Sequence, residues 1–528
     1  MIIARNRVPC TPHGAIRLRT ILLSGTAFLI TGGTSFAGSL PVSEVSSPTG
    51  IGNITRPFHL LPNSLVISSS TYDRTQGAVA DLTVGTPLAD TDKTTTPAVT
   101  GNLYPTVWNN EAVDASFGVT SPIELTEVDP IFGLTLFSLA IPTDTVATSF
   151  SSKSELGLHF APDLFGGQLT FMAYASPGVG ALDVSNSDAV AGQDPTNPVT
   201  FAFGRNYAFH RTIVSVDQNG QIVYTPTVNY GGNNGRSALL GANGLYYTVG
   251  NANNGNAATF GPSNGTSPDV TETTGLEAVD PINAPSPDVT IPVANSAEID
   301  PLLQFTVNGK LDKPGKDTNF RGVTEHDGAL FFTKGSGSNG IDTVYTVPTL
   351  PTVANAAQAT ISIVPGFPTD AAKVTGGDFT PFAVFFANDT TMYVADEGSG
   401  NATDAAEHAG LEKWSLVDGT WQLDYVLTSG LVGVVDTGLT GPDGPYPDVT
   451  TVGLRNLTGV VIGDTVTLWA TTSTSSASGD NGADPNKVVR ITDDLQATTM
   501  TPLVARESFV TIAGPTYGKV NRGVAFIP

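Results

Sequence analysis

The chain has 528 residues, of which 57 are glycine and 37 proline, and its formal net charge is −24. This excess of acidic side chains argues against binding to nucleic acid or to anionic membranes, which attract basic surfaces. The single cysteine, Cys10, excludes disulfide bonds. The many turn residues favour a β-rich protein, and 40% hydrophobic residues are enough for a core.

Residues 1–37 have the pattern of a secretory signal peptide. A short apolar run ends at a small-residue cleavage site, Ser35-Phe36-Ala37, and is too short to span a bilayer. Removal of the leader takes four of the 24 basic residues away, against 48 acidic ones, so the net charge becomes −28. We expect a secreted monomer, extracellular or periplasmic, that is released from the membrane. The leader's basic residues are Arg5, Arg7, Arg17 and Arg19.

Residues 38–64 are rich in Ser, Pro and Thr, and we interpret them as a linker. Leu65–Thr71 and Ala78–Val84 then have the composition of two strands. Neither follows the arginine-glycine step that precedes strands elsewhere, but this step occurs near the other end of the chain, at Arg522-Gly523. The sequence therefore predicts that the C-terminal strand pairs with the N-terminal strand and closes a ring without exposed sheet edges.

A repeated unit is clearest at residues 319–347. It consists of an arginine-glycine step, a polar turn, an apolar run, a glycine-serine loop and an alternating strand, which indicates consecutive antiparallel strands. Similar units occur at 381–416 and 457–492. Residues 252–300 have little apolar periodicity, and we expect a long loop or insertion there.

Further candidate units occupy 117–142, 152–185 and the region that begins at 235, and 211–228 has the pattern of a hairpin. We therefore predict an all-β, single-domain β-propeller over 65–528, with seven blades.

Several of these segments also resemble a family of exported bacterial and fungal β-propeller-like proteins. The resemblance covers most of residues 60–528 and implies the fold, but it implies no activity. The segments that support it are FGVTSPIE, TSFSSKSEL, NNGR with LYYTVGN, FRGVTEHDGALFFTKGSGSNG and MYVADEG.

The scarce basic residues recur at the start of the inferred innermost strands. In a propeller these positions meet at one mouth of the central channel, where fixed guanidinium groups could bind an anion such as a uronate-containing or sulfated glycan. The same residues could instead bridge neighbouring blades, through backbone carbonyls or acidic partners such as Glu155. The predicted ligand-binding residues are Lys153, Arg236, Arg321, Arg455 and Arg522.

A speculative catalytic group is Glu325-His326-Asp327, which follows Arg321 closely in sequence. A histidine between carboxylates can act as a general base near neutral pH, although a turn histidine can also be merely solvated. Paired carboxylates such as Asp396-Glu397 could serve glycoside hydrolysis at a suitable separation.

Metal and cofactor motifs are largely lacking. No zinc-ligand spacing, nucleotide-binding loop or serine-hydrolase elbow occurs, so we expect no metal and no cofactor. The oxygen-rich loop 478–486 could hold calcium but lacks the full EF-hand spacing. The sequence thus favours a β-propeller that binds an anionic ligand, such as an acidic polysaccharide, at a basic channel mouth. A carbohydrate-active lyase or hydrolase and a scaffold without a small ligand remain alternatives.

Overall fold

The structure is a computed structural model, and its described residues all lie within one compact unit, Arg56–Pro528. Strands dominate, and the described helical segments are α2 (Ala372–Thr375), η1 (Gly77–Asp81), η4 (Ala356–Gln358) and η5 (Val504–Arg506). None of them is long and apolar enough to cross a bilayer. The predicted leader 1–37 and residues 38–58 of the predicted linker lie outside the described residues. The structure describes 59–89, 95–98, 118–150, 152–163, 166–175, 178–180, 184, 210–252, 258–260, 270–287, 293–312, 318–375, 378–400, 409–435, 438–441, 444–446, 448–475 and 482–528.

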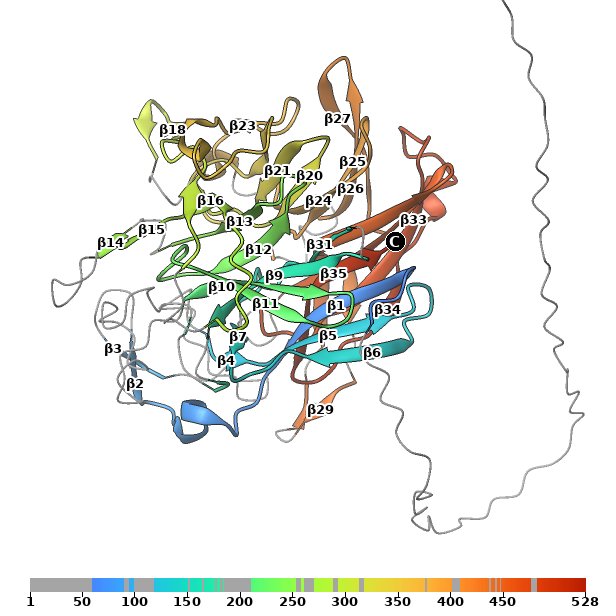
Figure 1. Cartoon of the computed structure of the whole chain (residues 1–528). Helices are drawn as coiled ribbons and strands as arrows, with labels where there is room; N and C mark the ends of the chain where they lie inside the picture. The colour runs from blue at the N-terminus through green and yellow to red at the C-terminus, as the bar shows by residue number, and fades with distance from the viewer. Residues whose placement is uncertain are drawn as a thin grey trace, which may run out of the picture. The chain divides into compact units, whose positions relative to one another are not determined.

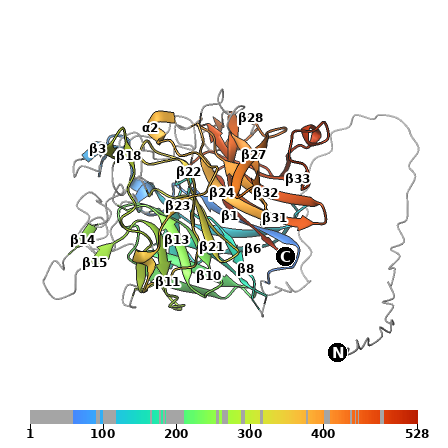
Figure 2. The ribbon, with the colours of Figure 1, turned by 90° about the horizontal axis from the view of Figure 1, so that it is seen from above.

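Antiparallel sheets form the blades of a β-propeller, whose strands are named here from the axis outward (Figures 1 and 2). The closing blade contains β35 (Lys519–Ile527), β1 (Ser64–Thr71), β5 (Ile123–Val128) and β6 (Thr135–Ala140). The next contains β8 (His159–Ala161), β9 (Gln168–Ala175), β10 (Arg211–Asp217) and β11 (Ile222–Thr227). The third contains β12 (Gly235–Leu240), β13 (Tyr246–Gly250), β16 (Gly275–Val279) and β17 (Ser296–Glu298).

The other three blades come from the C-terminal half of the chain. The fourth contains β20 (Val323–His326), β21 (Ala329–Lys334), β22 (Thr343–Val347) and β23 (Ser362–Ile363). The fifth contains β24 (Pro381–Asn388), β25 (Thr391–Asp396), β26 (Gly410–Val417) and β27 (Thr420–Leu427). The sixth contains β31 (Val449–Ile462), β32 (Thr465–Ser475), β33 (Val488–Asp494) and β34 (Val510–Ala513).

Shorter strands flank these blades. They are β2 (Pro87–Ala89), β3 (Thr95–Pro97), β4 (Thr120–Ser121), β7 (Val146–Ser149), β14 (Ala258–Phe260), β15 (Val270–Glu272), β18 (Thr306–Val307), β19 (Lys310–Leu311), β28 (Gly433–Val435), β29 (Thr440–Gly441) and β30 (Gly444–Pro445).

The propeller has six blades, so the prediction of seven is wrong. The innermost strands β35, β8, β12, β20, β24 and β31 contact one another in this order, and β31 returns to β35. The predicted unit 117–142 is not a separate blade, because its strands β5 and β6 are the outer half of the closing blade. Ala78–Val84, expected as a strand of that blade, begins within η1 instead.

The predicted closure by the two ends of the chain is confirmed. β1 pairs with β35 along almost its whole length, with Leu65 opposite Phe526 and Val66 opposite Ala525. Figure 1 shows the blue strand β1 among the red strands of the C-terminal region, and Figure 2 shows the C-terminus beside β1.

Alternation along β1 explains how the closing blade is held on both faces. Leu65 and Ile67 pack with Trp469 of the sixth blade, whereas Val66, on the other face, packs with Phe171 of the second. Successive strand residues point to opposite faces, so an uninterrupted apolar run suits a strand covered on both sides. Each buried side chain of this size contributes about 1.5–3 kcal/mol.

The segment expected as a loop, 252–300, instead supplies two outer strands of the third blade. β16 pairs with β13, and β17 pairs with β16, where Glu277 lies opposite Glu298. Both strands are short, and the polar residues in them interrupt the apolar pattern that would have revealed them.

Candidate functional site

The predicted basic residues occupy equivalent places in five of the six blades. Arg236, Arg455 and Arg522 lie in the innermost strands β12, β31 and β35, and Arg321 comes two residues before β20. Lys153 lies in the segment that leads to β8. The innermost strands are parallel to one another and run in the same direction along the axis, as the parallel bridge between Gly157 and Ser237 illustrates. All five cations therefore gather toward the same end of the channel, and we call them the cation cluster.

All four arginines are buried, with between 2% and 6% of their surface exposed. Arg236 donates to the backbone carbonyl of Phe320 at 2.5 Å, and Arg522 donates to the carbonyl of Phe150. Arg321 donates to the hydroxyl groups of Ser154 and Ser336. All of these bonds except that to Ser336, which lies in the same blade as Arg321, join different blades. The arginines therefore perform the bridging role that the sequence offered as an alternative to ligand binding.

Glu397, at the end of β25, is the main anion of this cluster. Its carboxylate accepts from Nζ of Lys153 at 3.0 Å and from Nε of Arg455 at 3.2 Å. Burial alone would raise the pKa of Glu397, but Lys153, Arg321 and Arg455 together hold it at about 2. Glu397 is therefore a permanent carboxylate that binds the second, fifth and sixth blades together.

The positive charges are not fully matched by hydrogen-bond acceptors. Nε of Arg236 and Nε of Arg321 are buried and have no hydrogen-bond partner. Burial lowers the pKa of Arg236, and the neighbouring charge of Arg321 lowers it further. Burial likewise lowers the pKa of Lys153, and the negative charge of Glu397 opposes this shift. The buried end of the channel thus keeps a positive potential.

A second carboxyl group, Glu155, lies on the second blade within this region. It accepts hydrogen bonds from the Thr148 hydroxyl at 2.6 Å and the Ser149 amide at 2.9 Å, and from the Tyr174 hydroxyl. Burial raises the pKa of Glu155 and also that of Tyr174, whose hydroxyl faces this carboxyl group. Desolvation is the largest cause of both shifts.

An open pocket of about 540 Å³ lies at the mouth beside the cation cluster. Ser336, which accepts from Arg321, lines it together with Glu397 and Lys153, whose side chain is 30% exposed. Lys373, paired with Asp312, also lines it, and the remaining lining is mostly glycine and hydroxyl groups. The pocket therefore offers fixed charges and hydroxyl donors and has the volume of a small-molecule site.

Two carboxyl groups that line this pocket have opposite electrostatic environments. Burial raises the pKa of Asp342, although Nζ of Lys334 lies 2.6 Å from its Oδ1 atom. The pKa of Glu397, as described above, is lowered to about 2. Pairs of acids with separated pKa values are a feature of acid–base active sites, and of structural ion-pair networks as well.

The structure does not bring Glu325-His326-Asp327 together with the cation cluster. His326 ends β20, five residues beyond Arg321, which corresponds to roughly 16 Å along an extended strand. Its ring stacks on Phe386 with centroids 4.2 Å apart, and Nε2 lies 3.1 Å from a carboxylate oxygen of Asp389. Glu325 accepts from the amide of Ala242 at 2.9 Å.

Asp327 has a turn role that accounts for its presence. Asp327 and Gly328 have φ values of 49° and 73° and connect His326 to its partner Ala329. Positive φ at both central residues defines the two-residue hairpin turn that favours Asp-Gly. Asp418-Gly419, between β26 and β27, repeats it. The catalytic role of Glu325-His326-Asp327 stays a prediction.

The described residues contain no group of three His, Cys, Asp or Glu side chains arranged to hold a metal ion. The first part of the oxygen-rich loop, 478–481, lies outside the described residues. Within its described part, Asp484 is buried and accepts from the Tyr446 hydroxyl at 2.6 Å and from Thr474. These contacts give Asp484 a structural role.

Sequence reasoning missed the link between Glu397 and Ser336. Asp396-Glu397 was noticed as a pair of acids and Ser336 as part of a glycine-serine loop, but 61 positions separate the two residues. Only the packing of the fourth blade against the fifth brings both into one pocket.

Comparison with known proteins finds similar solved structures but no family. No family model and no curated protein sequence matches the chain. The chain is similar to a Trypanosoma rangeli sialidase in complex with the inhibitor DANA, at 9% sequence identity and a TM-score of 0.30. The match covers 78% of this chain and 58% of the sialidase chain, so the chain spans little more than half of that protein. At this TM-score the likeness has no bearing on function.

Proposed function

We propose that the protein is exported and binds a small anionic ligand, or an anionic residue of an acidic polysaccharide, in the pocket beside the cation cluster. One observation supports this most directly: the pocket wall joins a partly exposed lysine side chain to a buried guanidinium. Lys153 opens into the pocket, and Arg321 reaches its wall through the hydroxyl of Ser336.

Charge and solvation explain why an anion suits this place. Buried cations need compensation, and Arg321 keeps one N–H group without an acceptor. Glu397 is shared between Lys153 and Arg455, so it does not neutralise Arg321 alone. A carboxylate or sulfate in the pocket would add negative charge next to Lys153 and accept from the hydroxyl groups around it.

The test is a binding measurement with a matched pair of sugars. Galacturonate and galactose differ mainly in one carboxylate, and we expect only galacturonate to raise the melting temperature, less so at high salt. Lys153→Gln should weaken binding about tenfold, because it removes a charged hydrogen-bond donor. The control Lys310→Gln changes an exposed lysine of β19 and should leave binding unchanged.

Equal responses to the two sugars, or an unchanged affinity in Lys153→Gln, would contradict the proposal. Glucose sulfate and glucose form a second matched pair, in case the pocket selects sulfate over carboxylate. Failure with both pairs leaves the scaffold alternative, in which the arginines only bridge blades.

A second candidate function is a carbohydrate-active lyase or hydrolase at the same pocket. The separated pKa values of Asp342 and Glu397 favour it, with Glu397 as the permanent carboxylate and Asp342 as the group that can hold a proton. Incubation with polygalacturonate should then release reducing ends or unsaturated products. Asp342→Asn should abolish that release while leaving galacturonate binding intact, and binding without any turnover would refute the enzyme.

A further inference from the structure

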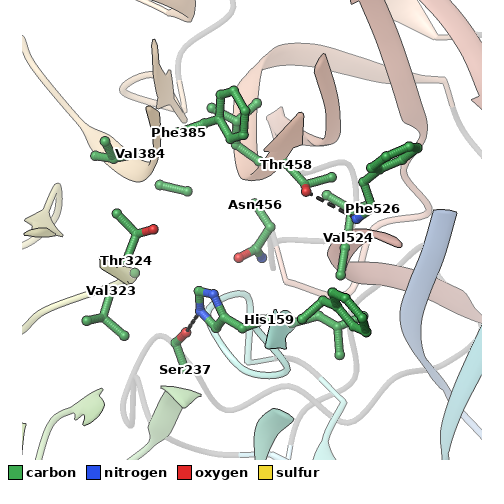
Figure 3. Close-up of a pocket in the computed structure, with 16 residues that line it drawn as sticks. His159, Ser237, Val323, Thr324, Val384, Phe385, Asn456, Thr458, Val524 and Phe526 are labelled. Carbon is green, nitrogen blue, oxygen red and sulfur yellow. Dashed lines mark hydrogen bonds between the residues drawn. The ribbon is translucent and has the colours of Figure 1, made fainter. Parts of the chain in front are cut away.

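A separate cavity lies on the axis, further along the innermost strands. It has a volume of about 140 Å³, and each of the six innermost strands contributes to its wall. Figure 3 shows its labelled side chains arranged around a common space. Asn456 follows Arg455 and Ser237 follows Arg236, so the same strands that hold the cation cluster continue into this cavity.

The cavity wall has no formal charge. No Asp, Glu, Lys or Arg is among the described residues that line it, and burial lowers the pKa of His159 to about 4, so this histidine is neutral at physiological pH. This cavity therefore has an uncharged wall, whereas charged side chains line the pocket at the mouth. An ion placed here would lose its hydration shell without a countercharge, which is strongly unfavourable.

Polar groups converge on one part of the wall. His159 Nε2 lies 2.7 Å from the Ser237 hydroxyl oxygen, which leaves the other ring nitrogen available. Asn456 uses Nδ2 to donate to the carbonyl of Arg522 at 2.7 Å. Its amide and the ring of His159 point toward one another across the cavity (Figure 3). Asn456 Oδ1 is thus an acceptor held in place by the bond that the same side chain makes through Nδ2.

The rest of the wall is apolar except for the threonine hydroxyls, of which that of Thr324 lies beside the space (Figure 3). Val384 and Phe385 of β24 lie at one side of the space, and Val524 and Phe526 of β35 lie at another (Figure 3). Thr458 is engaged, because its hydroxyl accepts from the Phe526 amide at 3.1 Å. A ligand that matches this wall has one polar end with a hydrogen-bond donor and one apolar end.

We propose that this axial cavity is a second binding site, which takes a small uncharged molecule with an amide or hydroxyl group and an apolar end. The volume equals that of roughly five water molecules, which limits the enclosed part of the ligand to a comparable number of heavy atoms. The donor of the ligand binds Asn456 Oδ1, and its acceptor or apolar end meets His159 and the valine and phenylalanine side chains. This inference does not depend on anion binding at the mouth.

The probes are isobutyramide and isobutyrate, which have the same shape and differ in charge. Saturation-transfer NMR on the full chain should show contact with isobutyramide and none above background with isobutyrate. Ala383→Leu fills part of the cavity and should abolish the isobutyramide signal. Thr324→Val removes a hydroxyl from the wall at almost constant volume and should weaken binding about two- to tenfold.

A control variant separates local from general effects. Thr420→Val, at an exposed position of β27, should bind isobutyramide like the wild type. If Ala383→Leu fails to fold, Thr324→Val still decides the question. The inference is overturned if isobutyramide gives no signal, if isobutyrate gives an equal signal, or if neither cavity variant changes the isobutyramide signal.

Discussion

The two regions along the propeller axis are built from the same innermost strands, yet they differ in charge and in the way they are stabilised. Toward the strand starts, Arg321, Arg455 and Lys153 surround the carboxylate of Glu397. Further along, the axial cavity is neutral, and His159 is paired with a serine hydroxyl.

This difference shows how one repeated element can serve two kinds of site. Every inner strand meets its neighbours at the axis, so equivalent positions face a common centre at each level. A charged residue at one position of several blades produces a charged ring, and small or apolar residues a few positions later produce a neutral cavity. The charge at each position along the axis therefore depends on the side chains there and not on the fold.

The largest effect is expected from removing the strand that belongs to both regions. Deletion of 521–528 removes Arg522 from the cation cluster and Val524 and Phe526 from the axial cavity. It also leaves one edge of β1 without a partner, while the other edge stays paired with β5. The deletion removes several buried apolar side chains as well, whose burial is together comparable to the whole stability of a typical domain. We expect no cooperative unfolding transition by circular dichroism and rapid proteolysis.

A matched deletion tests whether the loss comes from closure. Removing the short exposed turn of β18 and β19, residues 306–311, should leave the unfolding transition near that of the wild type. A chain without 521–528 that melts like the wild type would show that the closing pairing is dispensable.

The next effect concerns the cation cluster alone. Glu397→Gln preserves the shape of the side chain but leaves Lys153, Arg321 and Arg455 without their common carboxylate. Loss of one partner from a buried ionic network costs about 3–5 kcal/mol. In the axial cavity, Ser237→Ala removes a neutral hydrogen bond to His159 and should cost about 1 kcal/mol. Urea unfolding at neutral pH measures both, and equal losses would refute the proposed contrast.

The sequence predicted most of the architecture and part of the cation cluster, for identifiable reasons. Closure was predicted from the arginine-glycine step at Arg522, because the other strands of its blade do not follow it in sequence and had to come from the N-terminal region. The cations were found because each blade meets the axis in the same way. Blade number was wrong because β1 pairs with β5 across more than 50 residues, and such pairing depends on tertiary packing. Arg321 and His326 are neighbours in sequence, but an extended strand separates them.

Acidification should distinguish the two regions by the pH at which each loses stability. The folded-state pKa of His159 is about 4, below its ordinary 6.5, so the unfolded chain binds more protons between these values. Stability therefore falls as the pH decreases from about 6.5 to 4, by about 2–3 kcal/mol for this residue. Glu397, with a pKa of about 2 against 4.5, loses its contribution later, as the pH decreases from about 4.5 to 2.

Stability measured against pH in two variants separates these windows. His159→Gln should flatten the curve between pH 6.5 and 4 only in part, because burial also lowers the pKa of His210 to about 4. Glu397→Gln should reduce the slope below pH 4.5, and any change above that pH should come from Asp396, whose pKa of about 7 the charge of Glu397 helps to raise. If His159→Gln altered the slope below pH 4.5, then the two regions would be electrostatically coupled along the axis. The neutral cavity would then sense the charge of the cation cluster, which the uncharged wall of the cavity and the pairing of Lys153 with Glu397 argue against.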